Sequence, residues 1–177
     1  YVAPTVWAWR PGRAAKMAPL IDHVLALFPF EPPYMEAVGM TCDFVGHPVV
    51  TQTRATPAEA EAFRASNGIT PDQPLLLCLP GSRRGEVTRL LPRFRDAIAT
   101  LSARHPGLAI VLPTVRGVAP LVREMTGDWP TSPLIVEASD DKRAAFATAS
   151  LALAASGTVS LELAANRVPM VIAHDFN

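Results

Sequence analysis

Short apolar runs alternate with amphipathic segments through the second half of the chain. The apolar runs span residues 75–79, 108–112, 134–137, 151–155 and 169–173, and they have the length and composition of strands buried on both faces. Between them, residues 84–91, 92–104, 118–125, 141–148 and 159–166 show apolar positions at helical spacing. Strands that alternate with helices over short connections form a parallel sheet covered on both faces. The pattern predicts a Rossmann-type α/β domain over residues 75–177.

The first part of the chain has a less regular pattern. It predicts strands over 1–9, 23–28 and 42–45 and short helices over 13–22 and 31–38. Thr56 to Glu59 forms a capping-box pattern with proline at the first helical position, and Gly68 would end that helix. We therefore expect three parts. Residues 1–50 are the C-terminal part of an N-terminal α/β domain, 51–74 a linker with one helix, and 75–177 a second domain.

Composition and net charge argue against some classes of protein. The chain has 177 residues, is 49% apolar and carries no net charge, so its charge gives no support for a nucleic-acid partner. No apolar run reaches the roughly 18 residues of a membrane span, and there is no leader pattern. Because the sequence starts without Met and inside a strand-like run, we expect an internal part of a longer protein.

Patterns of metal and hydrolase sites are missing from the sequence. Cys42 and Cys78 lack metal-ligand spacing, and we expect both to be buried free thiols. We find no HExxH motif or Cys/His cluster, and no G-x-S-x-G elbow. A zinc site and a Ser-His-Asp hydrolase are therefore disfavoured.

A first candidate phosphate site follows the strand at 75–79. Gly81 can take a left-handed turn, Ser82 offers a hydroxyl and a backbone donor, and Arg83 supplies a guanidinium that matches phosphate oxygens. An ordinary strand-to-helix loop with a surface arginine explains the same residues equally well.

A second candidate follows the strand at 151–155. Ser156 is a suitable N-cap, Gly157 permits close approach of a diphosphate, and Thr158 starts a helix on which Glu162 lies one turn later. A carboxylate there can accept hydrogen bonds from a ribose diol. The alternative is a capped helix with a solvent-facing Glu162. Together the two turns predict a site for a nucleoside diphosphate, provided that both lie close enough to contact the same ligand.

Aromatic residues concentrate near the start of the chain. Trp7, Trp9 and Phe30 could line an acyl-chain or sugar cleft, and core packing explains them about as well. His47, in a Gly-His-Pro segment at the expected domain boundary, is a further candidate for that substrate cleft. A lone histidine there is more often a structural hydrogen-bond partner than a catalyst.

These segments together resemble the lipid-A-disaccharide synthase family, inverting glycosyltransferases of the GT-B fold. The resemblance rests on YVAPTVWAWR at residues 1–10, LFPFE at 27–31 and FVGHP at 44–48. It continues in LPGSR at 79–83, GEV at 85–87, ASGT at 155–158 and LE at 161–162. The order and spacing extend over essentially the whole chain.

The resemblance implies transfer of 2,3-diacylglucosamine from its UDP donor to 2,3-diacylglucosamine 1-phosphate, with release of UDP. It implies no cofactor and no metal. It further implies peripheral contact with the cytoplasmic face of the inner membrane, and it allows a homodimer. Two alternatives remain open: another UDP-sugar GT-B enzyme, such as an epimerase or a non-lipid transferase, and a non-catalytic nucleotide-binding module.

The resemblance also assigns roles to residues. Gly81, Ser82, Arg83 and the Ser156-Gly157-Thr158 turn would hold the diphosphate, and Glu162 the ribose. The catalytic aspartate of the family is expected upstream of Tyr1. We therefore assign no general base, and we expect this chain alone to bind UDP weakly without transferring sugar.

Overall fold

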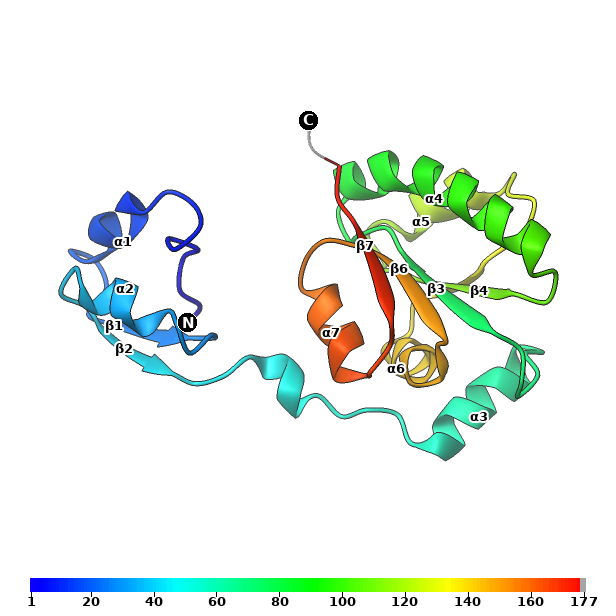
Figure 1. Cartoon of the computed structure of the whole chain (residues 1–177), viewed down its shortest axis with the longest axis horizontal. Helices are drawn as coiled ribbons and strands as arrows, with labels where there is room; N and C mark the ends of the chain where they lie inside the picture. The colour runs from blue at the N-terminus through cyan, green and yellow to red at the C-terminus, as the bar shows by residue number, and fades with distance from the viewer. Residues whose placement is uncertain (176–177) are drawn as a thin grey trace. The chain divides into compact units, whose positions relative to one another are not determined.

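The computed structural model describes residues 1–175 and divides the chain into two compact units, Tyr1–Gln52 and Thr53–Asn177 (Figure 1). We call them the N-terminal unit and the C-terminal unit. Each has its own sheet and its own core.

The C-terminal unit is built on one parallel sheet. Its strands are β3 (Leu75–Leu79), β4 (Ala109–Pro113), β5 (Leu134–Val136), β6 (Leu151–Ala155) and β7 (Met170–Ala173), in the order β5-β4-β3-β6-β7. The chain adds strands on one side of β3 and then on the other. The carboxyl ends of β3 and β6 are therefore neighbours at the topological switch point, where open α/β sheets bind their ligands.

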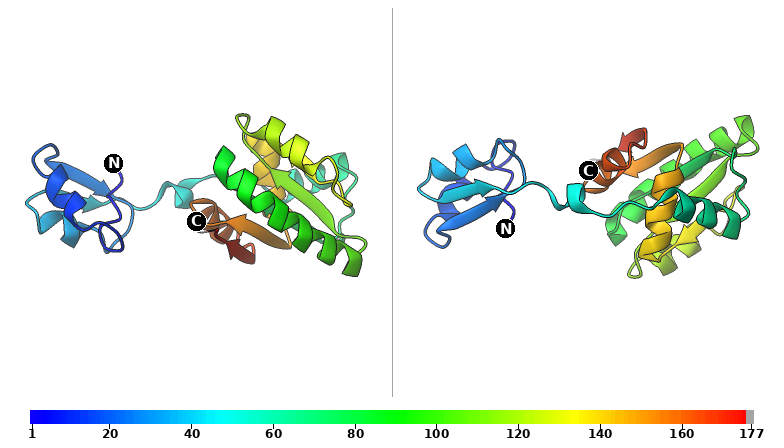
Figure 2. Two further views of the ribbon diagram at one scale, coloured as in Figure 1. Left: turned by 90° about the horizontal axis from the view of Figure 1, so that it is seen from above. Right: turned by 90° about the horizontal axis from the view of Figure 1, so that it is seen from below.

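Helices cover both faces of this sheet. They are α3 (Pro57–Ser66), α4 (Arg84–Arg104), α5 (Ala119–Thr126), α6 (Ser139–Thr148) and α7 (Val159–Ala165). Figure 2 shows α4 and α5 over one face in the left view, and α3, α6 and α7 toward the viewer in the right view.

The side chains of β3 alternate between these layers. Leu75 and Leu77 pack with Phe63 of α3, while Leu76 packs with Phe94 of α4. The sheet and its two helical layers confirm the α/β fold predicted from the sequence.

The prediction of two helices over 84–104 is wrong. The structure has one helix, α4, that continues through Pro92. Proline in a helix interior costs about 3 kcal/mol because it removes one backbone hydrogen bond and crowds the preceding turn. Here Val87, Leu91, Phe94 and Ile98 form one buried stripe on both sides of the proline. Burial of that stripe against the sheet outweighs the local cost.

Helix α3, which was predicted to lie in a linker, packs on the C-terminal unit. Phe63 belongs to the core of that unit. The Arg64 guanidinium donates to the carbonyls of Thr70 at 2.7 Å, Gln73 at 2.9 Å and Thr148 at 2.9 Å. These bonds tie α3 to the segment that leads into β3 and to the end of α6.

The N-terminal unit is a small α/β assembly. It contains α1 (Gly12–Met17), β1 (His23–Ala26), α2 (Pro32–Glu36), β2 (Thr41–Phe44) and the 3₁₀ helix η1 (Pro48–Thr51). The strands β1 and β2 pair in parallel. Buried Glu31 accepts hydrogen bonds from the backbone N–H groups of Leu27 at 3.0 Å and Phe28 at 2.9 Å, which fixes the turn after β1.

Residues 1–9 do not form the predicted strand. One backbone bond, from Val2 N–H to the Leu25 carbonyl, joins this segment to β1. The chain then turns, with the N–H of Trp9 donating to the Thr5 carbonyl at 2.9 Å. Pro4 has no N–H to continue a ladder, so the β-branched composition does not decide the local structure.

The two cysteines are buried free thiols, as predicted. Cys78 lies in the central strand β3, where burial raises the pKa of its thiol far above the ordinary value. Cys42 lies in β2 of the N-terminal unit.

Candidate functional site

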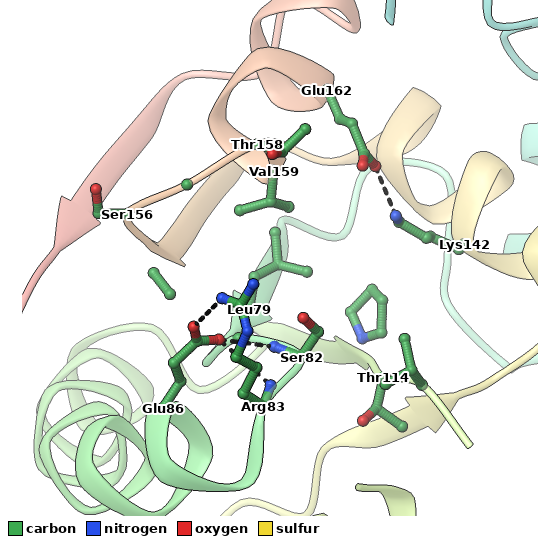
Figure 3. Close-up of a pocket in the computed structure, with 15 residues that line it drawn as sticks. Leu79, Ser82, Arg83, Glu86, Thr114, Lys142, Ser156, Thr158, Val159 and Glu162 are labelled. Carbon is green, nitrogen blue, oxygen red and sulfur yellow. Dashed lines mark hydrogen bonds and ion pairs between the residues drawn. The ribbon is translucent and has the colours of Figure 1, made fainter. Parts of the chain in front are cut away.

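Both predicted turns line one cavity at the carboxyl ends of β3, β4 and β6 (Figure 3). The residues predicted to bind nucleotide all lie on its wall: Gly81, Ser82, Arg83, Ser156, Gly157, Thr158 and Glu162. The wall is completed by Leu79, Glu86, Pro113, Thr114, Val115, Lys142, Ala155 and Val159. One ligand can therefore contact both turns, as the sequence-based hypothesis requires. The binding roles of these residues stay predictions.

The first turn depends on glycine. Gly81 has a φ of +111°, a conformation that residues with a side chain rarely adopt. A Cβ atom there would lie 2.7 Å from the Cβ of Glu86, closer than real contacts allow. A side chain at this position would push the first turn of α4 away from the end of β3.

The Glu86 carboxylate accepts hydrogen bonds from the backbone N–H groups of this turn. Its Oε2 accepts hydrogen bonds from the backbone N–H groups of Ser82 at 3.1 Å and Arg83 at 3.3 Å. The Arg83 guanidinium donates to Oε1 at 2.7 Å. Burial alone would raise the pKa of Glu86, but these bonds together outweigh it and hold the pKa below its ordinary value.

The motif containing Glu86 was noted in the sequence, but Glu86 itself was not proposed as a site residue. The available signal was its position three residues after Arg83, the spacing of a capping box at a helix start. The turn therefore binds a carboxylate oxygen where a phosphate oxygen was expected.

The second turn is arranged differently. Gly157 has a φ of +147°, and α7 starts two residues later. The prediction of Ser156 as N-cap is wrong: Thr158 holds that position, while the Ser156 N–H donates to the Ala173 carbonyl at 3.0 Å. Within residues 1–175, the N–H groups of Gly157 and Thr158 donate to no protein acceptor. These two donors are available to an anion in the cavity.

Glu162 reaches the cavity from α7 and forms an ion pair with Lys142 of α6. The Lys142 ammonium lies 2.6 Å from Glu162 Oε2 (Figure 3). It also lies 5.3 Å from the centre of the Phe146 ring. Lys142 was not predicted from the sequence. It is one of several charged residues at the start of α6, and only the packing of α6 against the sheet brings it to this cavity.

The predicted aromatic residues form a separate cluster in the N-terminal unit. Trp7 and Trp9 line a shallow hollow beside α1 and α2. Phe30 meets Trp7 edge to face, with ring centres 5.1 Å apart, and stacks on Phe28 at 5.5 Å.

His47 lies near the ring of Phe28, at 6.1 Å between ring centres. Its Nδ1 accepts a hydrogen bond from the Val49 N–H at 3.1 Å and caps η1. These contacts give His47 a structural role. A contact of this cluster with substrate stays a prediction.

Among residues 1–175, no helix combines the length and apolarity of a membrane span. The same residues contain no group of three or more His, Cys, Asp or Glu side chains placed to hold a metal ion.

Comparison with known proteins identifies similar sequences over the full length of the chain. The family model described as lipid-A-disaccharide synthetase matches residues 1–177. A lipid-A-disaccharide synthase of Ruegeria pomeroyi is 58% identical over 185 residues, covering 100% of this chain and 46% of that protein. The corresponding enzyme of Rhodospirillum centenum is 57% identical over 174 residues, covering 98% of this chain and 43% of that protein. The chain spans just under half the length of these relatives.

Solved structures share the fold at low sequence identity. A UDP-GlcNAc 2-epimerase from Neisseria meningitidis, bound to UDP-GlcNAc, has a TM-score of 0.65 at 12% identity, over 86% of this chain and 45% of that one. A family 9 glycosyl transferase from Veillonella parvula has a TM-score of 0.56 at 14% identity, over 94% and 61%. These neighbours confirm the GT-B-like fold class predicted from the sequence.

Proposed function

Since the chain belongs to the lipid-A-disaccharide synthetase family, we propose that it is the UDP-sugar-binding part of a glycosyltransferase of lipid A biosynthesis. The reaction transfers 2,3-diacylglucosamine from UDP to 2,3-diacylglucosamine 1-phosphate, with inversion at the anomeric carbon and release of UDP. The intact enzyme works in contact with the cytoplasmic face of the inner membrane, where its acylated substrates reside.

The observation that carries this proposal is the shared cavity of the two glycine turns and Glu162. The free N–H groups of Gly157 and Thr158 bind the diphosphate from one side, and the Arg83 guanidinium from the other. Glu162 accepts hydrogen bonds from the ribose hydroxyls. As the sugar leaves, negative charge grows on the diphosphate, and fixed N–H donors and a guanidinium stabilise that charge without a metal ion.

Binding of the diphosphate requires a rearrangement at the first turn. The N–H groups of Ser82 and Arg83 bond to Glu86, so a phosphate oxygen that takes these donors replaces the Glu86 carboxylate. The Glu86 side chain is 29% exposed and can turn toward solvent.

We assign no general base to this chain. From the family resemblance we expect the catalytic aspartate upstream of Tyr1, and we therefore expect weak UDP binding by this chain and no disaccharide formation. Multiple-turnover synthesis of the disaccharide by the purified chain would contradict that assignment.

Calorimetric titration with UDP, UMP and ATP tests the proposal. We expect binding of UDP in preference to UMP, because the cavity offers donors for two phosphates, and in preference to ATP, because the proposed sugar donor carries uridine. Glu162→Ala should weaken UDP binding by about 1–3 kcal/mol, the cost of removing one partner of a charged hydrogen bond.

Glu124→Ala is the matched control, because Glu124 is an exposed carboxylate on α5 that does not line the cavity. This variant should bind UDP like the wild type. Equal binding of UDP and ATP, or no binding of UDP, would overturn the proposed function. Unchanged UDP binding by Glu162→Ala would remove the ribose role alone.

A further inference from the structure

Lys142 is the one lysine or arginine besides Arg83 on the described wall of the cavity, and the proposed contacts with the diphosphate and the ribose do not involve it. We infer that Lys142 is a positioning residue that holds the Glu162 carboxylate for the ribose hydroxyls of the bound nucleotide. This inference rests on the proposed function and adds a specificity determinant for ribose to it.

The geometry leaves one carboxylate oxygen open. Lys142 Nζ lies 2.6 Å from Oε2 of Glu162. Within residues 1–175, Oε1 of Glu162 accepts no hydrogen bond. This single contact directs one oxygen of the carboxylate toward Lys142 and leaves the second oxygen available to a hydroxyl donor.

Lys142 is itself held in place. Its ammonium lies 5.3 Å from the ring centre of Phe146, one helical turn further along α6. Ala145 and Phe146 are buried in the core of the C-terminal unit, and their packing fixes α6 on the sheet. The Lys142 and Glu162 side chains are 39% and 22% exposed, which leaves both accessible to a ligand in the cavity.

Charge balance supports the same role. A lone carboxylate beside a diphosphate site would repel the ligand, whereas the pair of Lys142 and Glu162 has no net charge. Arg83 and Glu86 form a second such pair at the other turn. Lys142 therefore offsets the charge of Glu162 while leaving its acceptor oxygen in the cavity.

The test compares two nucleotides that differ only in the ribose hydroxyls, UDP and 2′,3′-dideoxy-UDP, by calorimetry on the purified chain. The wild type should prefer UDP. Lys142→Met should weaken UDP binding about tenfold, the size of one charged hydrogen bond, and leave the affinity for 2′,3′-dideoxy-UDP nearly unchanged.

Two further variants separate positioning from a structural effect. Lys142→Arg keeps a cation beside Glu162 and should restore most of the preference for UDP. Arg143→Met removes the neighbouring cation of α6, whose partners are Asp140 and Glu59 and which does not line the cavity. It should change neither affinity. Circular dichroism checks that each variant is folded.

The outcomes are distinct. Equal weakening of both nucleotides by Lys142→Met would place Lys142 on the diphosphate and overturn the inference. An unchanged preference for UDP in Lys142→Met would also overturn it, while the proposed function would stand. A wild type that binds neither nucleotide would overturn the proposed function and this inference with it.

Discussion

Glu86 accepts hydrogen bonds from N–H groups that a diphosphate would otherwise use. Its carboxylate gives these donors a partner and caps α4 at the same time. A phosphate bound as proposed would compete with this carboxylate for the same N–H groups. Under the proposed function, the stability of this turn and its affinity for a diphosphate are therefore opposed at Glu86.

Glu86→Gln tests that opposition. The amide removes the negative charge beside Arg83, so we expect UDP to bind about two- to fivefold more tightly, as expected for one charge at a partly exposed site. Uridine has no diphosphate, so its weak binding should stay unchanged. Calorimetry with both ligands measures the difference. Weaker binding of UDP by this variant would mean that the carboxylate organises the turn for the ligand.

The pH dependence of stability is a control on the same variant. The pKa of Glu86 is lowered in the folded protein, so its ionised form stabilises the fold above the pKa that it has when unfolded, about 4.3. The gap in unfolding free energy between wild type and Glu86→Gln should be complete at pH 7. This difference in unfolding free energy should shrink as the pH falls below the unfolded pKa of Glu86, and it should vanish below the folded pKa.

At the scale of elements, α4 shows how tertiary packing sets a helix length. The helix runs from Arg84 to Arg104 and carries Arg83, at its N-cap, to the cavity. Pro92 interrupts its backbone ladder, yet the buried stripe from Val87 to Ile98 continues on both sides. The sequence contains a local signal for a break and a periodic signal for continuity, and the periodic signal prevails.

Pro92→Ala should stabilise the C-terminal unit. Alanine restores the N–H that can bond to the Thr88 carbonyl, and Pro92 is exposed, so little packing is lost. We expect an increase in the free energy of unfolding of about 1–2 kcal/mol, less than the full helix penalty because proline also restricts the unfolded chain. Urea denaturation measures it.

Arg89→Ala is the matched control, since Arg89 is an exposed residue in the interior of the same helix. Its unfolding free energy should stay within about 0.5 kcal/mol of the wild type. A loss of stability in Pro92→Ala would show that the proline ring makes a contact that α4 needs.

Elements with a strong local signal were predictable from the sequence. The apolar runs gave the five strands of the C-terminal sheet, and Gly81 and Gly157 marked turns where the backbone takes a positive φ. Residues 1–9 were not predictable, because β-branched composition does not supply a strand partner. Lys142 was not predictable either, since its place at the cavity depends on how α6 packs.

At the scale of the whole molecule, the cavity belongs entirely to the C-terminal unit. Every residue on its described wall lies in that unit, which also has its own core and sheet. The elements that form this cavity therefore belong to a unit with its own sheet and core.

Residues 53–177 expressed alone should fold and bind UDP. We expect an affinity within about threefold of that of the full chain, a difference of less than 1 kcal/mol. Circular dichroism and calorimetry measure folding and binding. A folded fragment without affinity for UDP would show that the N-terminal unit contributes contacts to the nucleotide.

The position of the cysteines makes the two units separately observable. Cys78 lies in the middle of the central strand of one unit, and Cys42 in a strand of the other. A thiol reagent can modify Cys78 only after the sheet around it has opened, because reaction needs both access and a thiolate. The labelling rate of Cys78, followed by mass spectrometry of its peptide, would then report how often the C-terminal unit opens, while Cys42, which keeps 9% of its surface exposed, would report separately on the N-terminal unit.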